Sequence, residues 1–315
     1  MITYAKFDFN SFQREDVFVT DKNVFSLYNF PKSNTYVLPE IGEKAKSFAV
    51  VQSLCEFLLY RNFNRGGRII AVGGGTVCDT VGFVASIYKR GINLTLVPTT
   101  LIAMCDAGLG GKTAINVAEV KNAVGTFYKS DTMIDFSFLS TLPIEEFKNG
   151  LGEIVKYSLL NENINNSFAK RESSNDFKTD YLIEVIKLCV EYKQQIIEKD
   201  FYDINLRRAL NLGHTIGHAM ELKYNISHGQ AVLNGLYYET LLSFRLGYAQ
   251  SEYAKAILEY INKFVDIMPI DRFVLQLISN DKKNANDKIG FVLLTKPYET
   301  TNVNIAIDVV INALC

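Results

Sequence analysis

The sequence is poor in several residue types that mark particular protein classes. It has no tryptophan, six prolines and only three histidines, and its 33 Lys and Arg residues almost balance 34 Asp and Glu residues. A net charge of -1 provides no basic field for phosphate backbones, so we expect no nucleic-acid partner. No apolar run reaches the roughly 18 residues of a membrane span. The first residues lack the apolar stretch of a secretion signal. We therefore expect a cytoplasmic protein with no membrane partner.

Cysteine is also sparse and dispersed. The five cysteines form no C-x-x-C pair, which argues against a disulfide framework and against a thiolate metal site. We expect them to be small buried thiols. With 48% hydrophobic and 21% charged residues the composition is that of an ordinary globular protein.

The length of 315 residues suggests two domains, and the pattern changes near residue 145. Before that point, short β-rich runs alternate with helical patterns, and we predict strands over 17–19, 35–38, 68–72, 94–97 and 132–134. After it, apolar residues recur every three to four positions. The sequence therefore predicts an α/β domain with a mostly parallel sheet over 1–144 and an all-α domain over 145–315.

Two glycine clusters deserve a chemical interpretation. The predicted strand over 68–72 runs directly into Gly73, Gly74 and Gly75, and such a strand-to-helix turn lets backbone N–H groups approach a phosphate. Because a tight turn also needs glycine, nucleotide binding and a plain turn both remain open. The second cluster, around Gly110 and Gly111, lacks the spacing of a P-loop, which excludes an ATPase of that kind.

All three histidines fall between positions 214 and 228. His214 and His218 are four residues apart, which predicts one helical face, and Arg207 and Asn211 extend that face backwards. His228 lies where a following helix is predicted to begin. This clustering indicates a functional site, although satisfied core or surface histidines are the alternative.

Two glycines interrupt this histidine helix. Gly213 and Gly217 each cost roughly 1 kcal/mol against alanine, so we expect a close neighbour that requires them.

Two or three imidazoles and a carboxylate would form an open, catalytic zinc site. Glu153 is a plausible carboxylate, because it lies among apolar residues and Lys156 shares its helical face. From spacing alone, however, a surface ion pair between Glu153 and Lys156 is the favoured interpretation.

At this point the chain resembles a known family. Ordered blocks over nearly the whole length are similar to those of the 3-dehydroquinate synthases, within the wider group of sugar phosphate cyclases. The blocks are VTDKNV at 19–24, GEKAK at 42–46, GGGTVCD at 73–79, YKRG at 88–91, VPTT at 97–100, Asp106, GGKTAIN at 110–116, KN at 121–122, GEIVK at 152–156, RRALNLGHTIGH at 207–218 and HG at 228–229.

The resemblance implies a Rossmann-like NAD-binding domain over 1–144 and a metal- and substrate-binding domain over 145–315. It implies zinc, with cobalt as an alternative, on Glu153, His214 and His228, and proton transfer by His218. The residues implied around NAD are Asp21, Glu43, Lys46, Gly73, Gly74, Gly75, Thr76, Asp79, Thr99 and Thr100. Those implied around a small sugar phosphate are Asp106, Lys112, Lys121, Asn122, Lys156, Lys193, Arg207, Asn211 and Lys283. A homodimer is also implied, with Arg90 reaching the neighbouring subunit's site.

The implied reaction converts 3-deoxy-D-arabino-heptulosonate 7-phosphate to 3-dehydroquinate and phosphate, as a carbon–oxygen lyase of the shikimate pathway. Transient oxidation by NAD, elimination of phosphate, reduction and aldol closure give no net redox change. The chain departs from the family pattern in three places. Much of a helix between residues 28 and 43 is missing, Gln230 replaces a carboxylate, and Asp203 and Asn205 replace a glutamate and a glycine.

Three other functions remain open. The departures at 200–205 allow a cyclase that acts on another sugar phosphate. A metal-dependent polyol or glycerol phosphate dehydrogenase would share the fold but would show net NADH. The blocks at 110–116 and 152–156 argue against that dehydrogenase. A non-catalytic descendant would be expected to lose the histidines and lysines that this chain retains.

Overall fold

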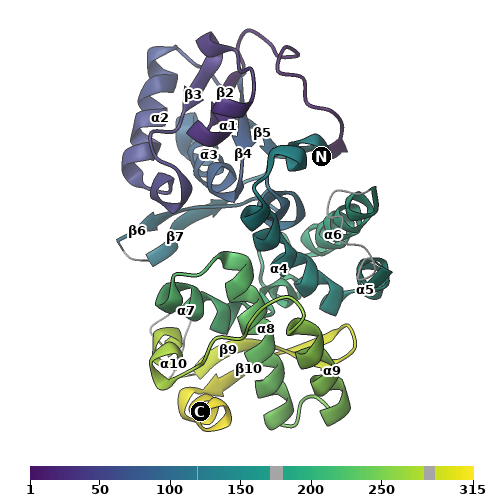
Figure 1. The fold of residues 1–315 in the computed structure, drawn as a ribbon. Helices are drawn as coiled ribbons and strands as arrows, with labels where there is room; N and C mark the ends of the chain where they lie inside the picture. The colour runs from purple at the N-terminus through teal and green to yellow at the C-terminus, as the bar shows by residue number, and fades with distance from the viewer. Residues whose placement is uncertain (119, 171–179, 280–287) are drawn as a thin grey trace. The chain divides into compact units, whose positions relative to one another are not determined.

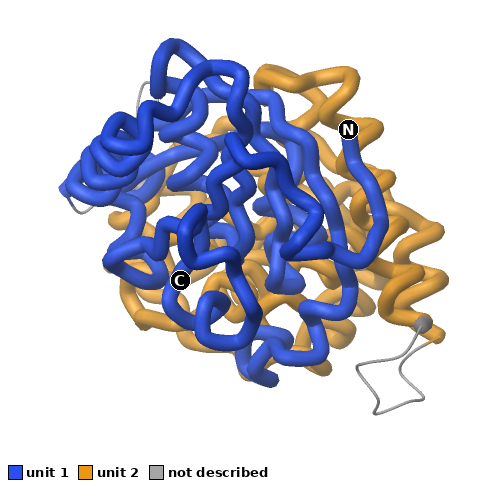
Figure 2. The backbone as a smooth tube through the Cα atoms, turned by 90° about the horizontal axis from the view of Figure 1, so that it is seen from above, with its two compact units in different colours: residues 1–147 blue, residues 148–315 orange. Residues whose placement is uncertain are grey.

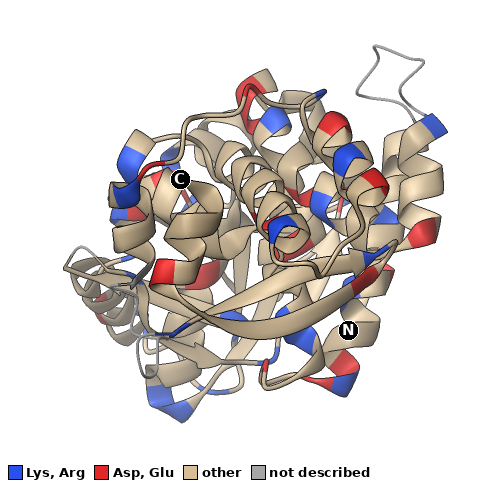
Figure 3. Ribbon diagram, turned by 90° about the horizontal axis from the view of Figure 1, so that it is seen from below, with Lys and Arg blue, Asp and Glu red and all other residues tan. Residues whose placement is uncertain are grey.

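The computed structural model describes residues 1–118, 120–170, 180–279 and 288–315. The chain forms two compact units, Met1–Phe147 and Lys148–Cys315, which are described separately (Figures 1 and 2). No helix among the described residues is long and apolar enough to cross a membrane. Figure 3 shows lysine and arginine residues interspersed with aspartate and glutamate residues, in keeping with the nearly neutral net charge.

The first unit is built on a six-stranded, wholly parallel sheet. Its strands are β1 (Ile2–Tyr4), β2 (Val17–Thr20), β3 (Thr35–Val37), β4 (Arg68–Gly73), β5 (Asn93–Pro98) and β8 (Asp131–Ile134), in the spatial order β1-β8-β5-β4-β2-β3. The five predicted strands are confirmed to within two residues at each end. The edge strand β1 was not predicted, because three residues carry too little periodicity.

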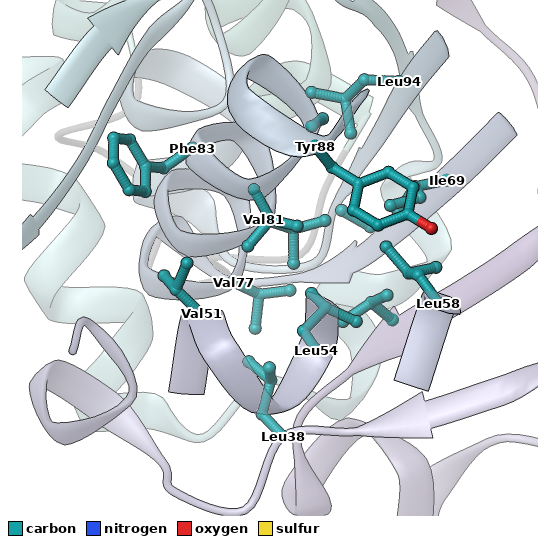
Figure 4. Packing of buried hydrophobic residues seen from close by; sticks show 14 of the residues in the cluster. Leu38, Val51, Leu54, Leu58, Ile69, Val77, Val81, Phe83, Tyr88 and Leu94 are labelled. Carbon is teal, nitrogen blue, oxygen red and sulfur yellow. The ribbon is translucent and has the colours of Figure 1, made fainter. Parts of the chain in front are cut away.

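Two helices, α2 (Phe48–Tyr60) and α3 (Gly75–Ile87), pack on one face of this sheet (Figure 4). Leu54 and Val81 from these helices and Ile69 from β4 are completely buried in the same cluster. The Ser47 hydroxyl caps α2 by accepting a hydrogen bond from the Val50 N–H at 3.3 Å. A continuous apolar core therefore fixes the strand-to-helix turn between β4 and α3.

The other side of β2 carries aromatic residues. Phe18 alternates with the core residues of β2, and its ring packs edge-on against Phe12, Phe7 and Phe30 at centroid distances of 5.2, 6.2 and 6.1 Å. Phe7 and Phe12 precede β2, and Phe30 follows the short helix α1 (Lys22–Leu27). Between residues 28 and 43 the chain has only 3₁₀ turns and β3, which agrees with the helix expected to be missing there.

The direction in which successive strands are added to the sheet reverses between β2 and β4. From β2 the chain continues to β3 on one side, whereas from β4 it continues to β5 on the other side. Ligands of open α/β sheets bind at such a switch point, outside the carboxyl ends of the strands. Asp21 follows β2 and Gly74 follows β4, so the topology places both residues at this position.

The remaining elements of the first unit are short. An antiparallel hairpin joins β6 (Lys112–Val117) to β7 (Val120–Phe127). The 3₁₀ turns are η1 (Lys32–Asn34), η2 (Gly42–Ala45), η3 (Tyr88–Arg90) and η5 (Phe136–Thr141), and η4 (Ala103–Ala107) is a π-helical turn.

The second unit is mostly helical, as predicted. Its described helices are α4 (Ile144–Leu160, which begins at the end of the first unit), α5 (Glu162–Ala169), α6 (Asp180–Lys199), α7 (His214–Tyr224), α8 (His228–Arg245), α9 (Ser251–Ile261), α10 (Arg272–Ser279) and α11 (Ile307–Leu314), with the 3₁₀ helix η7 (Leu206–Asn211). The expectation of an all-α domain needs one correction. An antiparallel hairpin of β9 (Lys288–Lys296) and β10 (Glu299–Ala306) packs against α8, and its Phe291 and Leu293 belong to the apolar core of the unit.

Candidate metal centre and nucleotide site

Helix α4 supplies a buried pair of opposite charges. The side chains of Glu153 and Lys156 are 0% and 1% exposed, and the Lys156 Nζ lies 2.5 Å from the Glu153 Oε2. The surface ion pair favoured from spacing is therefore wrong. A buried ion pair is a weak source of stability, because desolvation of both groups offsets their attraction.

The other two candidate ligands each begin a helix. His214 is the first residue of α7 and His228 is the first residue of α8. The prediction that a helix begins at His228 is confirmed, and His214 and His218 share α7, but the single stripe from Arg207 to His218 is wrong. Gly213, at a φ of +79°, interrupts the helical conformation between η7 and α7. This left-handed geometry is available to glycine at little cost.

The expected close neighbour of the two glycines is α8. A Cβ on Gly217 would lie 2.8 Å from the Ala231 carbonyl oxygen, and a Cβ on Gly235 would lie 1.8 Å from the Gly213 carbonyl oxygen. The two helices thus pack backbone to backbone, and this close approach brings their first residues together.

The Glu153 carboxylate contacts both imidazoles. Its Oε1 lies 3.0 Å from the His228 Nε2 and 3.4 Å from the His214 Nε2, and one donor atom from each residue lies within 4.8 Å of the others. Two imidazole nitrogens and one carboxylate oxygen match the donor set of catalytic zinc sites that keep a position open for substrate. The residues present therefore fit a divalent transition metal.

Both histidines have a second hydrogen-bond partner that orients the ring. The His214 Nδ1 lies 3.1 Å from the Leu212 carbonyl oxygen, and the His228 Nδ1 lies 3.4 Å from the Glu221 Oε2. In each ring the Nδ1 contact fixes the orientation, so that Nε2 is the nitrogen that faces Glu153. Sequence reasoning missed Glu221, although its position seven residues after His214 places it on the same face of α7.

Electrostatics keep this cluster receptive to a cation. Burial opposes ionisation of Glu153, but Lys156 and the two imidazoles hold the pKa of its carboxyl well below the usual range. Burial lowers the pKa of His214, which keeps its nitrogen lone pair available. Burial also opposes protonation of His228, but the carboxylates of Glu153 and Glu221 outweigh it and raise the pKa of its imidazole to about 10. A carboxylate pair around one imidazole attracts positive charge.

His218 lies beside this cluster. Its ring centroid is 5.4 Å from that of His214 and 6.2 Å from that of His228, and its side chain is exposed. The structure thus brings all three histidines together but leaves His218 outside the donor set. An exposed imidazole next to a cation site is suited to proton transfer.

Further polar candidates belong to the second unit. Arg207 is buried in η7, and its guanidinium donates a hydrogen bond to the Phe201 carbonyl oxygen at 2.7 Å. The Asp200 carboxylate accepts the Arg207 N–H at 3.0 Å and holds the preceding loop. Lys193 is buried in α6, whereas Asn211 ends η7 and is half-buried. Lys283 lies outside the described residues.

In the first unit, the glycine cluster forms the turn between β4 and α3. Gly73, Gly74 and Gly75 have no positive φ, so backbone conformation does not require glycine there. Space does, because a Cβ would lie 2.5 Å from Val77 at Gly73 and 3.1 Å from Thr100 at Gly74. Helix α3 begins here without a side-chain cap. The first N–H groups of a helix have no partner within the helix, and at such a position they suit a phosphate.

A polar network surrounds Lys46 near the start of α3. Lys46, only 4% exposed, makes an ion pair with Asp79 at 2.6 Å and a hydrogen bond with Asn122. Glu43 is connected to the same network, since Asn116 donates to its Oε2 at 2.8 Å. The structure therefore places three residues predicted around NAD next to Asn122, which was predicted around the substrate.

The other candidates of the first unit occupy separate positions. Asp21 caps α1 by accepting the Val24 N–H at 3.0 Å. Thr99 is buried, its N–H bonds the Gly73 carbonyl oxygen at 3.0 Å, and Thr100 caps the turn after β5. Thr76 lies half-buried in the first turn of α3 and Asp106 lies half-buried in η4, whereas Lys112 and Lys121 are exposed on the hairpin.

Arg90 is exposed on a strained turn. Lys89, Arg90 and Gly91 have successive φ values of 47°, 66° and 112°. Left-handed geometry costs a residue with a side chain roughly 1–2 kcal/mol, and such strain concentrates at functional positions.

The departure at Gln230 has a structural explanation. Its side-chain oxygen accepts from the Ser227 N–H at 3.2 Å, and the Ser227 hydroxyl accepts from the Gln230 N–H, which forms a capping box at the start of α8. Glutamine and glutamate serve equally at this capping position.

A cavity of about 530 Å³ lies elsewhere in the first unit. It opens at the amino ends of the parallel strands, where Arg68 and Asp16 form an ion pair at 2.6 Å. Because ligands of such sheets bind at the carboxyl ends, this cavity is not the nucleotide site.

Solved structures share this architecture. The fold is similar to that of 2-deoxy-scyllo-inosose synthase complexed with carbaglucose-6-phosphate, NAD⁺ and Co²⁺, with a TM-score of 0.87, 25% identity and coverage of 99% of this chain and 95% of that one. It is also similar to 2-epi-5-epi-valiolone synthase from Streptomyces hygroscopicus with NAD⁺ and Zn²⁺ bound, with a TM-score of 0.85, 23% identity and coverage of 100% and 95%. A probable glycerol dehydrogenase from Sinorhizobium meliloti matches less closely, with a TM-score of 0.56, 12% identity and coverage of 95% and 89%. The chain thus has the fold of the sugar phosphate cyclases.

Sequence comparison identifies the family. Residues 36–149 match the family model of the 3-dehydroquinate synthase N-terminal region, and residues 150–284 match that of the C-terminal region. The 3-dehydroquinate synthase of Saccharolobus solfataricus is 39% identical over 293 residues, covering 88% of this chain and 82% of the relative. That of Alkaliphilus metalliredigens is 37% identical over 301 residues, covering 87% and 82%. The chain belongs to the 3-dehydroquinate synthase family, as its sequence blocks predicted.

Proposed function

We propose that the chain is an NAD- and metal-dependent lyase that converts 3-deoxy-D-arabino-heptulosonate 7-phosphate to 3-dehydroquinate and phosphate. The observation that carries this proposal is the convergence of Glu153, His214 and His228 beside the buried Lys156. Membership of the family supports the same activity, since the relatives that carry this name match most of the chain.

We assign residues 1–144 to NAD binding and residues 145–315 to metal and substrate binding. The glycine cluster at the start of α3 offers backbone N–H groups to the pyrophosphate, and Lys46 and Asp79 lie in the adjoining network. Glu153, His214 and His228 hold zinc or cobalt. When bound, NAD accepts and returns a hydride, and the metal polarises the reacting oxygen.

The chain's own residues perform the remaining tasks. His218 exchanges protons with the substrate, because its imidazole is exposed and adjacent to the cation site. Lys156, fixed by Glu153, presents a cation to an anionic substrate group. We assign the other contacts to the substrate's phosphate, carboxylate and hydroxyls to Asp106, Lys112, Lys121, Asn122, Lys193, Arg207, Asn211 and Lys283, because fixed cationic and amide donors suit these groups.

We also assign Arg90 to the active site of a second copy in a homodimer. The exposure of its side chain and the strained turn that presents it support this assignment. Strain of this kind persists where it serves a function.

The test of the proposed function is phosphate release from 3-deoxy-D-arabino-heptulosonate 7-phosphate with NAD and Zn²⁺ supplied. We expect stoichiometric 3-dehydroquinate and no accumulation of NADH at 340 nm. Net NADH would instead indicate a dehydrogenase. Failure to turn over this compound, in a protein that binds both metal and NAD, would overturn the substrate assignment.

A cyclase acting on another sugar phosphate is the second candidate. Asp203, at a φ of 57°, and Asn205 change the loop that leads into Arg207. Phosphate release from a different sugar phosphate, and not from the heptulosonate, would favour this candidate.

A further inference from the structure

Helix α7 begins without a cap of its own. Its N-cap position is Gly213, which has no side chain, and the φ of +79° fits glycine. The first N–H groups of any helix lack partners within the helix and need acceptors from elsewhere. Serine, threonine or aspartate usually supplies that acceptor from the N-cap position. In α7 the acceptor must come from another element.

That acceptor is the carboxyl group of Glu239 on α8. Its Oε2 accepts the Gly213 N–H at 2.6 Å and its Oε1 accepts the Ile216 N–H at 3.1 Å, and the Thr215 N–H also bonds this group. Glu239 is 0% exposed. It lies one turn after Gly235, where the two helices pack backbone to backbone. The contact is therefore a buried cap supplied by one helix to its neighbour.

We propose that Glu239 is a positioning residue for the metal centre: it caps α7 from α8 and thereby fixes the His214 ring in its metal-binding orientation. This inference rests on the proposed function only in assigning His214 to the metal. Glu239 itself touches neither the metal ligands' donor atoms nor any substrate contact assigned above.

The physical link runs through the turn before α7. The His214 Nδ1 is bound to the Leu212 carbonyl oxygen at 3.1 Å, so the ring direction follows the backbone of residues 212–214. Glu239 anchors the middle of that turn at the Gly213 N–H. Glu239 thus ties the start of α7 to the middle of α8, the helix that carries His228 at its first residue.

Two opposing effects act on the protonation of Glu239. Burial raises the pKa of its carboxyl to about 8, although the backbone N–H donors oppose that rise. Both oxygens of a carboxyl group keep lone pairs in either state. In Glu239→Gln, by contrast, one oxygen becomes an NH₂ group, which would face an N–H donor.

The experiment compares Zn²⁺ affinity, measured by chelator competition, and the visible spectrum of the Co²⁺-loaded protein, in the absence of any sugar phosphate. We expect Glu239→Gln to weaken Zn²⁺ binding roughly 10- to 100-fold, the range for lost orienting partners, and to alter the Co²⁺ bands. The matched control is Ser243→Ala. Ser243 is buried one turn further along α8 and bonds the Leu294 carbonyl oxygen in β9, away from α7.

Retention of wild-type Zn²⁺ affinity and Co²⁺ bands by Glu239→Gln would overturn the proposal, as would equal weakening in Ser243→Ala. Should the glutamine variant not fold, Glu239→Asp decides. Its carboxylate is one methylene shorter, so intermediate affinity supports the proposal and unchanged affinity overturns it. If the wild-type protein binds metal but does not release phosphate, the proposed function is contradicted and the inference about Glu239 is unaffected.

Discussion

The Nε2 of His228 lies 3.0 Å from the Oε1 of Glu153, although 75 residues separate them in the chain. The contact exists because α4 and α8 pack without side chains between them. A Cβ on Gly152 would lie 2.6 Å from Gly229, and the Asn149 side chain accepts the Gly229 N–H at 2.6 Å. Each ligand therefore has a glycine beside it in sequence, at the point where the helices meet.

Replacing the two histidines of α7 separately distinguishes their roles. We expect His214→Ala to abolish stoichiometric metal binding, because it removes one of three donors. His218→Ala should retain the metal and lower kcat by roughly 10²- to 10⁴-fold, the usual contribution of a positioned proton-transfer group. Metal content by atomic emission and turnover by phosphate release check both. Equal metal loss in the two variants would contradict this division of roles.

The sequence predicted which residues form the candidate site more fully than how they are held. The three histidines stand out by type and spacing, whereas Glu153 was assigned to the metal by the family resemblance, since spacing alone favoured a surface ion pair with Lys156. Burial of Lys156 could not be predicted, since the i, i+3 spacing with Glu153 is the same on a surface helix. Glu221 was missed for a similar reason, because its role depends on α8 bringing His228 to it.

The fold was predicted best where the local pattern is long. The central strands are fully buried apolar runs between turn residues, which makes them evident in sequence. The hairpin of β9 and β10 was missed, because its pairing depends on contacts with α8 rather than on local alternation. The break at Gly213 was hidden by the helical spacing of Asn211, His214 and His218.

A side chain at Gly74 tests the nucleotide site. We expect Gly74→Val to weaken NAD binding tenfold or more, a loss of about 1.4 kcal/mol, because its methyl groups would cover the backbone at the start of α3. Gly66→Val is the control, since Gly66 precedes the opposite end of β4. Isothermal titration calorimetry with NAD measures both. Equal affinities in the two variants would argue against a phosphate position at Gly74.

The cysteines should differ sharply in reactivity. Cys315 is exposed and Cys55 is half-buried, whereas Cys78, Cys105 and Cys189 are buried, so the expectation of small buried thiols holds for three of the five. Burial raises the pKa of the Cys78 thiol, which suppresses the reactive thiolate. A thiol-disulfide reagent at pH 8 should label Cys315 first, and Cys315→Ser should remove this fast phase. Rapid labelling of Cys78 in the native protein would contradict its burial.

Mixing two inactive variants tests whether Arg90 acts in a second copy. Arg90→Ala leaves the metal ligands intact, and His214→Ala leaves Arg90 intact, so a mixed dimer would contain one complete site if Arg90 crosses the interface. After the subunits are separated in mild denaturant and recombined in equal amounts, we expect roughly a quarter of wild-type phosphate release, because half of the dimers are mixed and each has one active site.

The same mixture decides between the alternatives for Arg90. If Arg90 served its own subunit, neither site of a mixed dimer would be complete, and the mixture would stay as inactive as its components. Wild-type protein taken through the same treatment controls for losses on recombination, and light scattering reports the mass of the recombined species. A monomeric mass for active wild-type protein would also contradict the assignment, because the exposed turn at Arg90 would then have no neighbouring site to complete.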